Sequence, residues 1–169
     1  IIEKSLGQSF IIDYPKKFST RVIVQKVLYL LTHGNLNPKL KIPYKWSFYL
    51  HGPYSPEIAN MIYHINDLSN ELDRMQIHLG DNEIKAINHF LDFNKSLTKQ
   101  KNEIKGFNAL SEEELFEILA TLTYMAKQVG GYQKKISDSF KRFKPELDKK
   151  MSKPVLNSIF SNLTKYGYI

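Results

Sequence analysis

The longest run of closely spaced hydrophobic positions lies over Arg21–His33. Leucine, isoleucine, valine and tyrosine side chains leave only a narrow polar stripe there, which consists of Arg21, Gln25 and Thr32. A helix that is apolar almost all round is usually the buried one of its domain. Ser19 or Thr20 comes just before the run, and both are residue types that cap the start of a helix. The pattern therefore predicts a central helix over these residues.

A two-residue period replaces the helical one over residues 44–50. Apolar positions alternate there with less apolar ones and comprise Tyr44, Trp46, Phe48 and Leu50. Such alternation is typical of a half-buried strand. A second alternation, at Met75, Ile77 and Leu79, predicts a short strand that pairs with the first to form a hairpin.

The chain leaves the first strand through the run His51-Gly-Pro-Tyr-Ser-Pro. Gly52 and Pro53 are residue types that favour a turn. Ser55 is a good N-cap, and Pro56 suits the first position of a helix. Each residue of the run thus has a structural role, and we expect a rigid corner here instead of an active site.

Further helices are predicted toward the C-terminus, over Asp81–Lys99, Glu112–Lys127, Tyr132–Lys144, Pro145–Met151 and a last stretch that begins at Ser152-Lys-Pro. Ser111-Glu-Glu-Glu has the form of a capping box, and Gly130-Gly131 marks a break. The side chains expected to face inward include Ile84, Ile87, Phe90, Leu91, Ile136, Phe140 and Phe143.

These elements predict a fold that is mainly α with a small β-hairpin (α+β). We expect a helical bundle with winged-helix or helix-turn-helix-like packing, formed as a single domain over residues 1–169 with a C-terminal helical part over 127–169. Apolar residues make up 42% of the chain and aromatic residues 12%, which indicates a folded domain and excludes a disordered chain. The absence of cysteine excludes disulfides and thiolate chemistry and fits a cytoplasmic location. No run approaches the roughly 18 apolar residues of a membrane span, so no membrane partner is expected.

The positive charge of the chain is unevenly distributed. Residues 127–165 hold ten Lys or Arg and three Asp or Glu, whereas the rest of the chain holds fourteen of each. The formal net charge of +7 therefore lies entirely in the C-terminal quarter. Such an asymmetry favours a polyanionic partner, although a solvated lysine-rich helix face would give the same count.

We find no pattern of residues that indicates catalysis, a metal site or a cofactor. The five histidines are His33, His51, His64, His78 and His89, and none has the helical spacing and glutamate of a metalloprotease site. Ser55 lacks the flanking glycines of a hydrolase nucleophile. No glycine-rich loop has the sequence that holds a phosphate. We therefore expect a protein that is not an enzyme.

Three blocks of sequence occur in order within residues 19–169. They are Arg21-Val-Ile-Val-Gln25-Lys26-Val-Leu-Tyr29-Leu-Leu, Tyr49-Leu-His-Gly52-Pro53-Tyr54-Ser55-Pro56-Glu57-Ile58 and Leu115-Phe-Glu-Ile-Leu-Ala120-Thr121-Leu-Thr-Tyr124. This order resembles the YwgA-like family of small prokaryotic proteins. The first two blocks are also distantly similar to the Panacea or SocA-like antitoxin domain.

The resemblance implies an intracellular helical protein with helix-turn-helix-like packing, and the Panacea likeness implies a role in binding proteins. His51 departs from the pattern, since an aromatic residue is commoner before the glycine. The positions that match the family motif are expected to be structural, and they are Arg21, Gln25, Lys26, Tyr29, Gly52, Pro53, Tyr54, Ser55, Pro56 and Glu57.

The charge distribution favours a nucleic-acid-binding regulator. The residues expected to contact phosphates are Lys134, Lys135, Lys141, Arg142, Lys144, Lys149, Lys150 and Lys153. Only one of them is an arginine, the usual reader of guanine edges, so we expect weak sequence preference. The last helix is expected to present Asn157, Ser158, Ser161 and Asn162 outward and to end before a wing strand.

The alternative is a protein-interaction module of the toxin–antitoxin or antiviral accessory type. Ten tyrosines and ten phenylalanines supply aromatic side chains that could anchor a protein partner, Tyr54 among them. Ordinary core packing would account for many of the same residues.

Overall fold

The computed structural model describes residues 2–7, 10, 13–33, 40–41, 43–64 and 79–169. In these ranges the chain is mainly helical with a small antiparallel sheet, so the predicted α+β class is confirmed. The strand expected at Met75 and Ile77 lies outside the described residues. The elements in chain order are α1 (Ile2–Leu6), α3 (Phe18–Thr32), β1 (Ser47–Tyr49), β2 (Gly52–Tyr54), α4 (Pro56–His64), α6 (Asp81–Glu103), the short 3-10 helix η1 (Phe107–Ala109), α7 (Glu112–Val129), α8 (Gln133–Phe143), α9 (Pro145–Lys150) and α10 (Lys153–Lys165).

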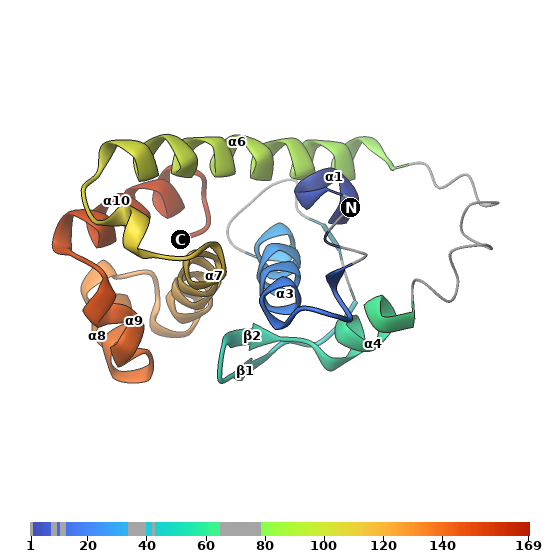
Figure 1. Ribbon diagram of the computed structural model, residues 1–169, viewed down its shortest axis with the longest axis horizontal. Coiled ribbons are helices and arrows are strands. Elements are labelled where there is room, and N and C mark those ends of the chain that lie inside the picture. The colour runs from blue at the N-terminus through green and yellow to red at the C-terminus, as the bar shows by residue number, and fades with distance from the viewer. Residues whose placement is uncertain (1, 8–9, 11–12, 34–39, 42, 65–78) are drawn as a thin grey trace.

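Helices α3 and α7 form the centre of the molecule and lie side by side beneath α6 (Figure 1). Nearly every residue of α3 from Thr20 onward is buried, which confirms the predicted central helix. It begins at Phe18, earlier than expected, and no side chain caps its start. Ser19 and Thr20 lie within its first turn, so their predicted capping role is wrong. Apolar contacts with the neighbouring elements therefore position this helix.

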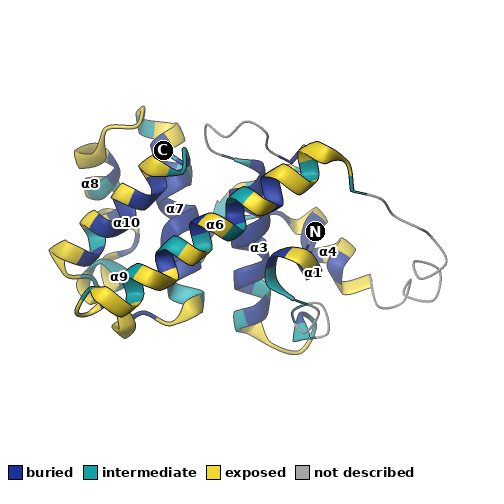
Figure 2. Ribbon diagram, turned by 90° about the horizontal axis from the view of Figure 1, so that it is seen from above, coloured by how far each residue is buried: buried dark blue, intermediate teal, exposed yellow. Residues whose placement is uncertain are grey.

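Helix α6 crosses over both central helices, as the view from above shows (Figure 2). It ends at Glu103, beyond the predicted Lys99, and Phe93 and Leu97 continue the buried stripe that Ile87 and Phe90 begin. Ile84 was expected to face inward but is exposed near the first turn of the helix. No helix among the residues placed in the structure is both long and apolar enough to cross a membrane.

Helix α7 begins at the predicted capping box. The Ser111 hydroxyl accepts a hydrogen bond from the Glu114 amide at 3.1 Å, and the Glu114 carboxylate accepts one from the Ser111 amide at 3.0 Å. At the other end, Gly130 takes the left-handed conformation with φ of 82°. These local signals define both ends of the helix.

The β-hairpin differs from the predicted one. Strand β1 pairs with Gly52–Tyr54, in the register Ser47 with Tyr54 and Tyr49 with Gly52. The turn is formed by Leu50 and His51, so the predicted turn at Gly52-Pro53 is wrong. The half-buried alternation is present up to Phe48, but Leu50 projects into solvent from the turn.

Helices α8, α9 and α10 complete the fold on one side of α7 (Figure 1). Ile136 and Phe140 of α8 are buried as expected, whereas Phe143 is exposed. After α10 the chain folds back, with the Tyr168 amide donating to the Leu163 carbonyl at 2.7 Å. The Tyr168 ring is buried against Phe93, so within residues 153–169 no wing strand follows the last helix.

Candidate functional site

The exposed face of α8 holds four of the eight cations predicted to contact nucleic acid. Lys134, Lys135, Lys141 and Arg142 are all exposed, while Ile136 and Phe140 occupy the opposite face. Asp138 is the one acidic residue in this helix. The α8 face, as we call these four cations with Asp138, thus carries a local excess of positive charge.

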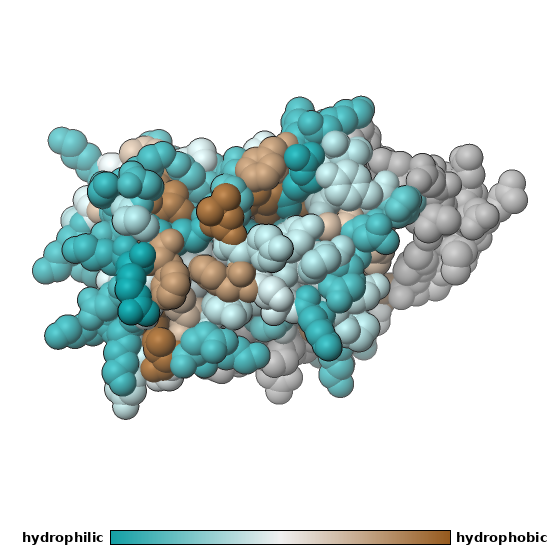
Figure 3. All heavy atoms as spheres, turned by 90° about the horizontal axis from the view of Figure 1, so that it is seen from below, coloured by the Kyte–Doolittle hydropathy of each residue, from teal (hydrophilic) through white to brown (hydrophobic). Residues whose placement is uncertain are grey.

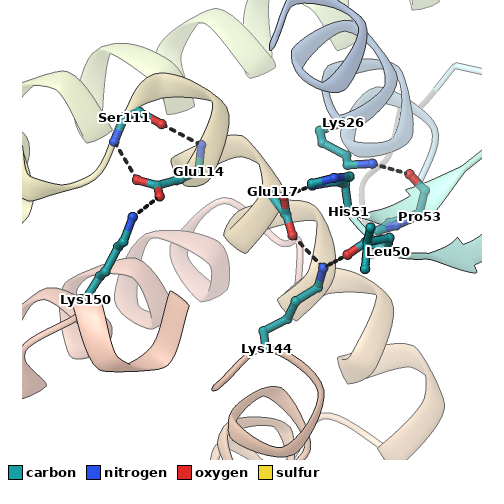
Figure 4. A network of polar contacts seen from close by, with 9 residues as sticks. All are labelled: Lys26, Leu50, His51, Pro53, Ser111, Glu114, Glu117, Lys144 and Lys150. Atoms are coloured by element: carbon teal, nitrogen blue, oxygen red, sulfur yellow. Dashed lines mark hydrogen bonds and ion pairs between the residues drawn. The ribbon is translucent and has the colours of Figure 1, made fainter. Parts of the chain in front are cut away.

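Lys144 does not belong to this surface. Its side chain is only 8% exposed, and its amine donates to Glu117 Oε1 at 2.5 Å and to the Leu50 carbonyl (Figure 4). The prediction that it contacts phosphate is therefore wrong, because a buried and paired amine is not available at the surface. It sits at the C-terminal cap of α8, where it ties that helix to α7 and to the hairpin turn.

The remaining predicted cations are exposed but partly neutralised. Lys150 donates to the Glu114 carboxylate of the capping box, which lowers the pKa of Glu114 (Figure 4). Lys149 pairs with Glu146 at 3.0 Å. Lys153 is exposed at the first position of α10. Among the eight predicted cations, those without a carboxylate partner in the described part of the chain are the four of the α8 face and Lys153.

A shallow, polar groove runs between the start of α8 and α10. It has a volume of about 570 Å³ and is lined by Gln133, Asn157, Phe160, Ser161, Thr164 and Lys165. Asn157 and Ser161 face outward as predicted. Ser158 and Asn162 do not, because both donate hydrogen bonds to the Gln100 side-chain oxygen of α6. Gln133, which lines the groove, is followed by Lys134 of the α8 face at the N-terminal end of α8.

The motif residues of α3 hold the corner between the hairpin and α4. The Gln25 amide nitrogen donates to the Ser55 carbonyl and the Ser55 amide donates to Gln25 Oε1, each at 3.1 Å. Lys26 Nζ donates to the Pro53 carbonyl at 2.7 Å. Two neighbouring side chains of one helix thus satisfy the main-chain groups of residues 53–55, which supports a structural role for this part of the motif.

Gly52 is required by a close approach between the hairpin and α7. Its φ is +83°, and a Cβ placed there would lie 2.5 Å from Thr121 Oγ1.

At the start of α4, the Ser55 hydroxyl donates to the Glu57 carboxylate at 2.9 Å. A hydrogen bond from the Glu57 main-chain amide and this bond from Ser55 lower the pKa of Glu57.

A cavity of about 510 Å³ lies between α3, the hairpin and α4. Aromatic side chains form much of its wall: Tyr14, Phe18, Tyr49, Tyr54 and Tyr63. Its polar and charged lining groups are Arg21, Gln25, Lys26 and His51. Six motif residues thus line a hollow of a size that accepts a small molecule, and they are Arg21, Gln25, Lys26, Gly52, Tyr54 and Pro56.

Buried charged groups lie beside Lys26 and His51, two of the residues that line this cavity (Figure 4). The Lys26 side chain is 2% exposed, and burial lowers the pKa of its amine to about 7, with the nearby Lys144 acting in the same direction. The Glu117 carboxylate opposes this effect, and it also lies 2.9 Å from His51 Nδ1. Two amines therefore share one carboxylate in a region of low dielectric.

Reasoning from the sequence missed the role of Glu117 and of the pair it forms with Lys144. A signal was present, because Glu117 is a carboxylate within the apolar run Leu115–Leu122, and a buried carboxylate needs a cation. The partner could not be identified, since it lies 27 residues further along the chain.

No family model, curated protein or solved structure matches the chain.

Proposed function

We propose that the chain is a nucleic-acid-binding regulatory protein that contacts phosphates through the α8 face. The observation that carries the proposal is the charge of this face, where four exposed cations surround one carboxylate. Phosphate contacts supply most of the affinity in binding that is not sequence-specific. The hydrophilic side chains around α8 and α9 are visible beside the apolar ones in Figure 3.

The polar groove next to α8 supports the same proposal. Asn157 and Ser161 present hydrogen-bonding groups that suit a sugar-phosphate backbone, and Lys165 adds a cation. In this proposal α8, α9 and α10 act in a helix-turn-helix-like manner inside the cytoplasm. The resemblance to the YwgA-like family is consistent with this packing and stays a prediction.

The test is the salt dependence of binding to a mixed-sequence DNA duplex, followed by fluorescence anisotropy between about 50 and 200 mM salt. Four phosphate contacts give a slope of roughly −3 to −4 in log K against log salt. Lys134→Gln combined with Lys141→Gln is expected to weaken binding and to reduce the magnitude of that slope by about 2. Single-stranded DNA and RNA of the same sequence identify the preferred strand type.

The matched control is Lys95→Gln combined with Lys99→Gln. These lysines are also exposed on a helix, α6, and removing them changes the net charge equally. The control is expected to bind nearly as well as the unaltered protein. Equal losses in the two double variants, or no binding at about 50 mM salt, would contradict the proposal.

A second candidate function is binding of a protein partner by the hairpin face. Leu50 is 79% exposed and Tyr49 64%, and the exposed rings of Phe18 and Phe143 belong to the neighbouring helices. Apolar side chains gather between the hairpin and α8 in Figure 3. Contiguous exposed apolar groups are typical of interaction surfaces.

Leu50→Asp distinguishes this candidate from the first. If the hairpin face binds a protein, a single stoichiometric partner should co-purify after nuclease treatment and be lost from Leu50→Asp. The same partner should be retained by the Lys134→Gln, Lys141→Gln variant. A partner that disappears with nuclease treatment would instead support nucleic-acid binding.

A further inference from the structure

The cavity between α3, the hairpin and α4 has a one-sided charge. Among the residues that the structure describes, its lining includes the guanidinium of Arg21, the amine of Lys26 and the imidazole of His51, together with four tyrosines, but no Asp or Glu. Lys26 follows Gln25 on the same helix and also lines the cavity, although it is buried. A cavity lined in this way attracts an anion.

The buried charged groups around Lys26 are also short of negative charge. Lys26 and Lys144 are both buried and charged when protonated, and Glu117 is the carboxylate that both approach. A buried charge without a counterion is costly. When the cavity is empty, loss of the proton from Lys26 relieves this cost. An anion bound in the cavity would relieve it by supplying the missing negative charge.

Arg21 retains hydrogen-bonding capacity for such a ligand. Its described hydrogen bond, to the Pro15 carbonyl, is long at 3.4 Å, and its guanidinium lies 5.5 Å from the centre of the Phe18 ring. A guanidinium has five N–H donors in a planar fork that matches a carboxylate or phosphate. Lys26 uses one N–H on Pro53 and keeps two others.

Aromatic rings complete the cavity wall. Tyr14 contacts Tyr63 edge to face at 5.4 Å, and Tyr49 lies 5.6 Å from Tyr54. Phe18 stands edge to face against His51 at 5.0 Å. Rings held by other rings offer flat, preordered apolar surfaces, which suit a planar ligand better than a flexible one.

We propose that this cavity binds a small ligand that combines an aromatic ring with one carboxylate or phosphate group. Arg21 and Lys26 hold the anionic group, and the tyrosines contact the ring. The cavity volume of about 510 Å³ lies in the range of small-molecule sites. The proposal does not depend on nucleic-acid binding, since no residue of the α8 face lines the cavity.

Isothermal titration calorimetry with four probes tests the proposal. The probes are benzoate, a purine nucleoside monophosphate, inorganic phosphate and benzyl alcohol. At least one of the two ring-bearing anions is expected to bind at least tenfold more tightly than inorganic phosphate and benzyl alcohol. Tighter binding of benzoate than of the nucleotide indicates a site for a carboxylate, and tighter binding of the nucleotide indicates a site for a phosphate ester.

Proton uptake provides a readout that a merely structural Lys26 would not give. An anion beside the amine raises the pKa of Lys26, so binding at pH 8 should take up a substantial fraction of one proton. At pH 6 the amine is already protonated and the uptake should be small. The groups that face Lys26 are Glu117, Lys144 and His51, and comparing buffers of different ionisation enthalpy gives the net proton number.

Three variants complete the test. Lys26→Met and Arg21→Gln are each expected to weaken binding at least tenfold, and Lys26→Met should abolish the proton uptake. Lys17→Gln is the control, because Lys17 lies at the same end of α3, pairs with Asp13 and does not line the cavity. No binding of either ring-bearing anion at millimolar concentration, or unchanged affinity in both Arg21→Gln and Lys26→Met, would overturn the proposal.

Discussion

The amine of Lys144 and the carboxylate of Glu117 form a buried ion pair, with 2.5 Å between Nζ and Oε1. Lys144 comes from the end of α8 and Glu117 from the middle of α7. The same amine reaches the Leu50 carbonyl, so one side chain joins two helices and the hairpin turn. This connection fixes the position of α8 relative to the cavity between α3, the hairpin and α4.

Lys144→Met is expected to lower the free energy of unfolding by about 3 kcal/mol, because Glu117 would keep a buried charge without its closest cation. Urea denaturation at pH 8 measures the loss. Lys149→Met is the control, since the pair of Lys149 with Glu146 is exposed and contributes less than about 1 kcal/mol. Equal losses in the two variants would show that the buried pair stabilises the fold no more than the exposed pair does.

The contribution of Lys26 to stability should depend on pH. Its pKa is about 7 in the folded chain and 10.5 in the unfolded one. Between these values the unfolded state binds the proton and the folded state does not, so stability rises with pH by up to about 1.4 kcal/mol per pH unit. Below pH 7 Lys26 is protonated in both the folded and the unfolded state. Its contribution to the free energy of unfolding therefore stays at its least favourable value.

The measurement for Lys26 is the difference in unfolding free energy between the unaltered protein and Lys26→Met from pH 6 to pH 10. Other titrating groups largely cancel in this difference. It should increase in favour of the unaltered protein above pH 7. A difference that is constant over the whole range would mean that Lys26 remains charged in the folded state.

Gly52→Ala is expected to destabilise the chain by about 2 kcal/mol or more. The left-handed backbone contributes roughly 1 kcal/mol, and the contact of the new Cβ with Thr121 adds the rest. Gly131→Ala separates the two effects, because its φ is +79° and nothing lies within 4 Å of its Cβ position. Thermal unfolding should show the larger loss for Gly52→Ala. Adding Thr121→Ala to Gly52→Ala should recover part of it.

Ser111→Ala should lower stability by about 1 kcal/mol, because it removes the hydroxyl that caps α7. Ser152 offers a comparison, since it precedes α10 without a capping hydrogen bond from its side chain. Ser152→Ala should therefore change stability by only a few tenths of a kcal/mol. Chemical denaturation of both variants provides the measurement, and an equal effect would contradict the capping geometry.

Features that depend on neighbouring residues could be predicted from the sequence. The capping box at Ser111 and the break at Gly130 are local, and both are present. The burial of α3 also follows from its composition, because so apolar a helix cannot face water. The predicted capping role of Ser19 or Thr20 was wrong, because α3 begins at Phe18 and both residues lie within its first turn.

Features that depend on distant partners could not be predicted. A glycine followed by proline suggests a turn, but pairing with β1 places Gly52 and Pro53 in a strand and moves the turn to Leu50 and His51. Lys144 looked like one more surface cation. Its burial depends on a carboxylate that the sequence does not connect to it.

The attachment of Lys144 also limits how the molecule can be divided. A fragment that ends at Val129 would lose the amine that neutralises Glu117 and the buried side chains Ile136 and Phe140 that cover α7. Helix α7, which carries the Glu117 carboxylate, would then be exposed to water. The positively charged C-terminal quarter is thus not an appendage that can be exchanged between proteins, and grafting it elsewhere would require grafting the face of α7 with it.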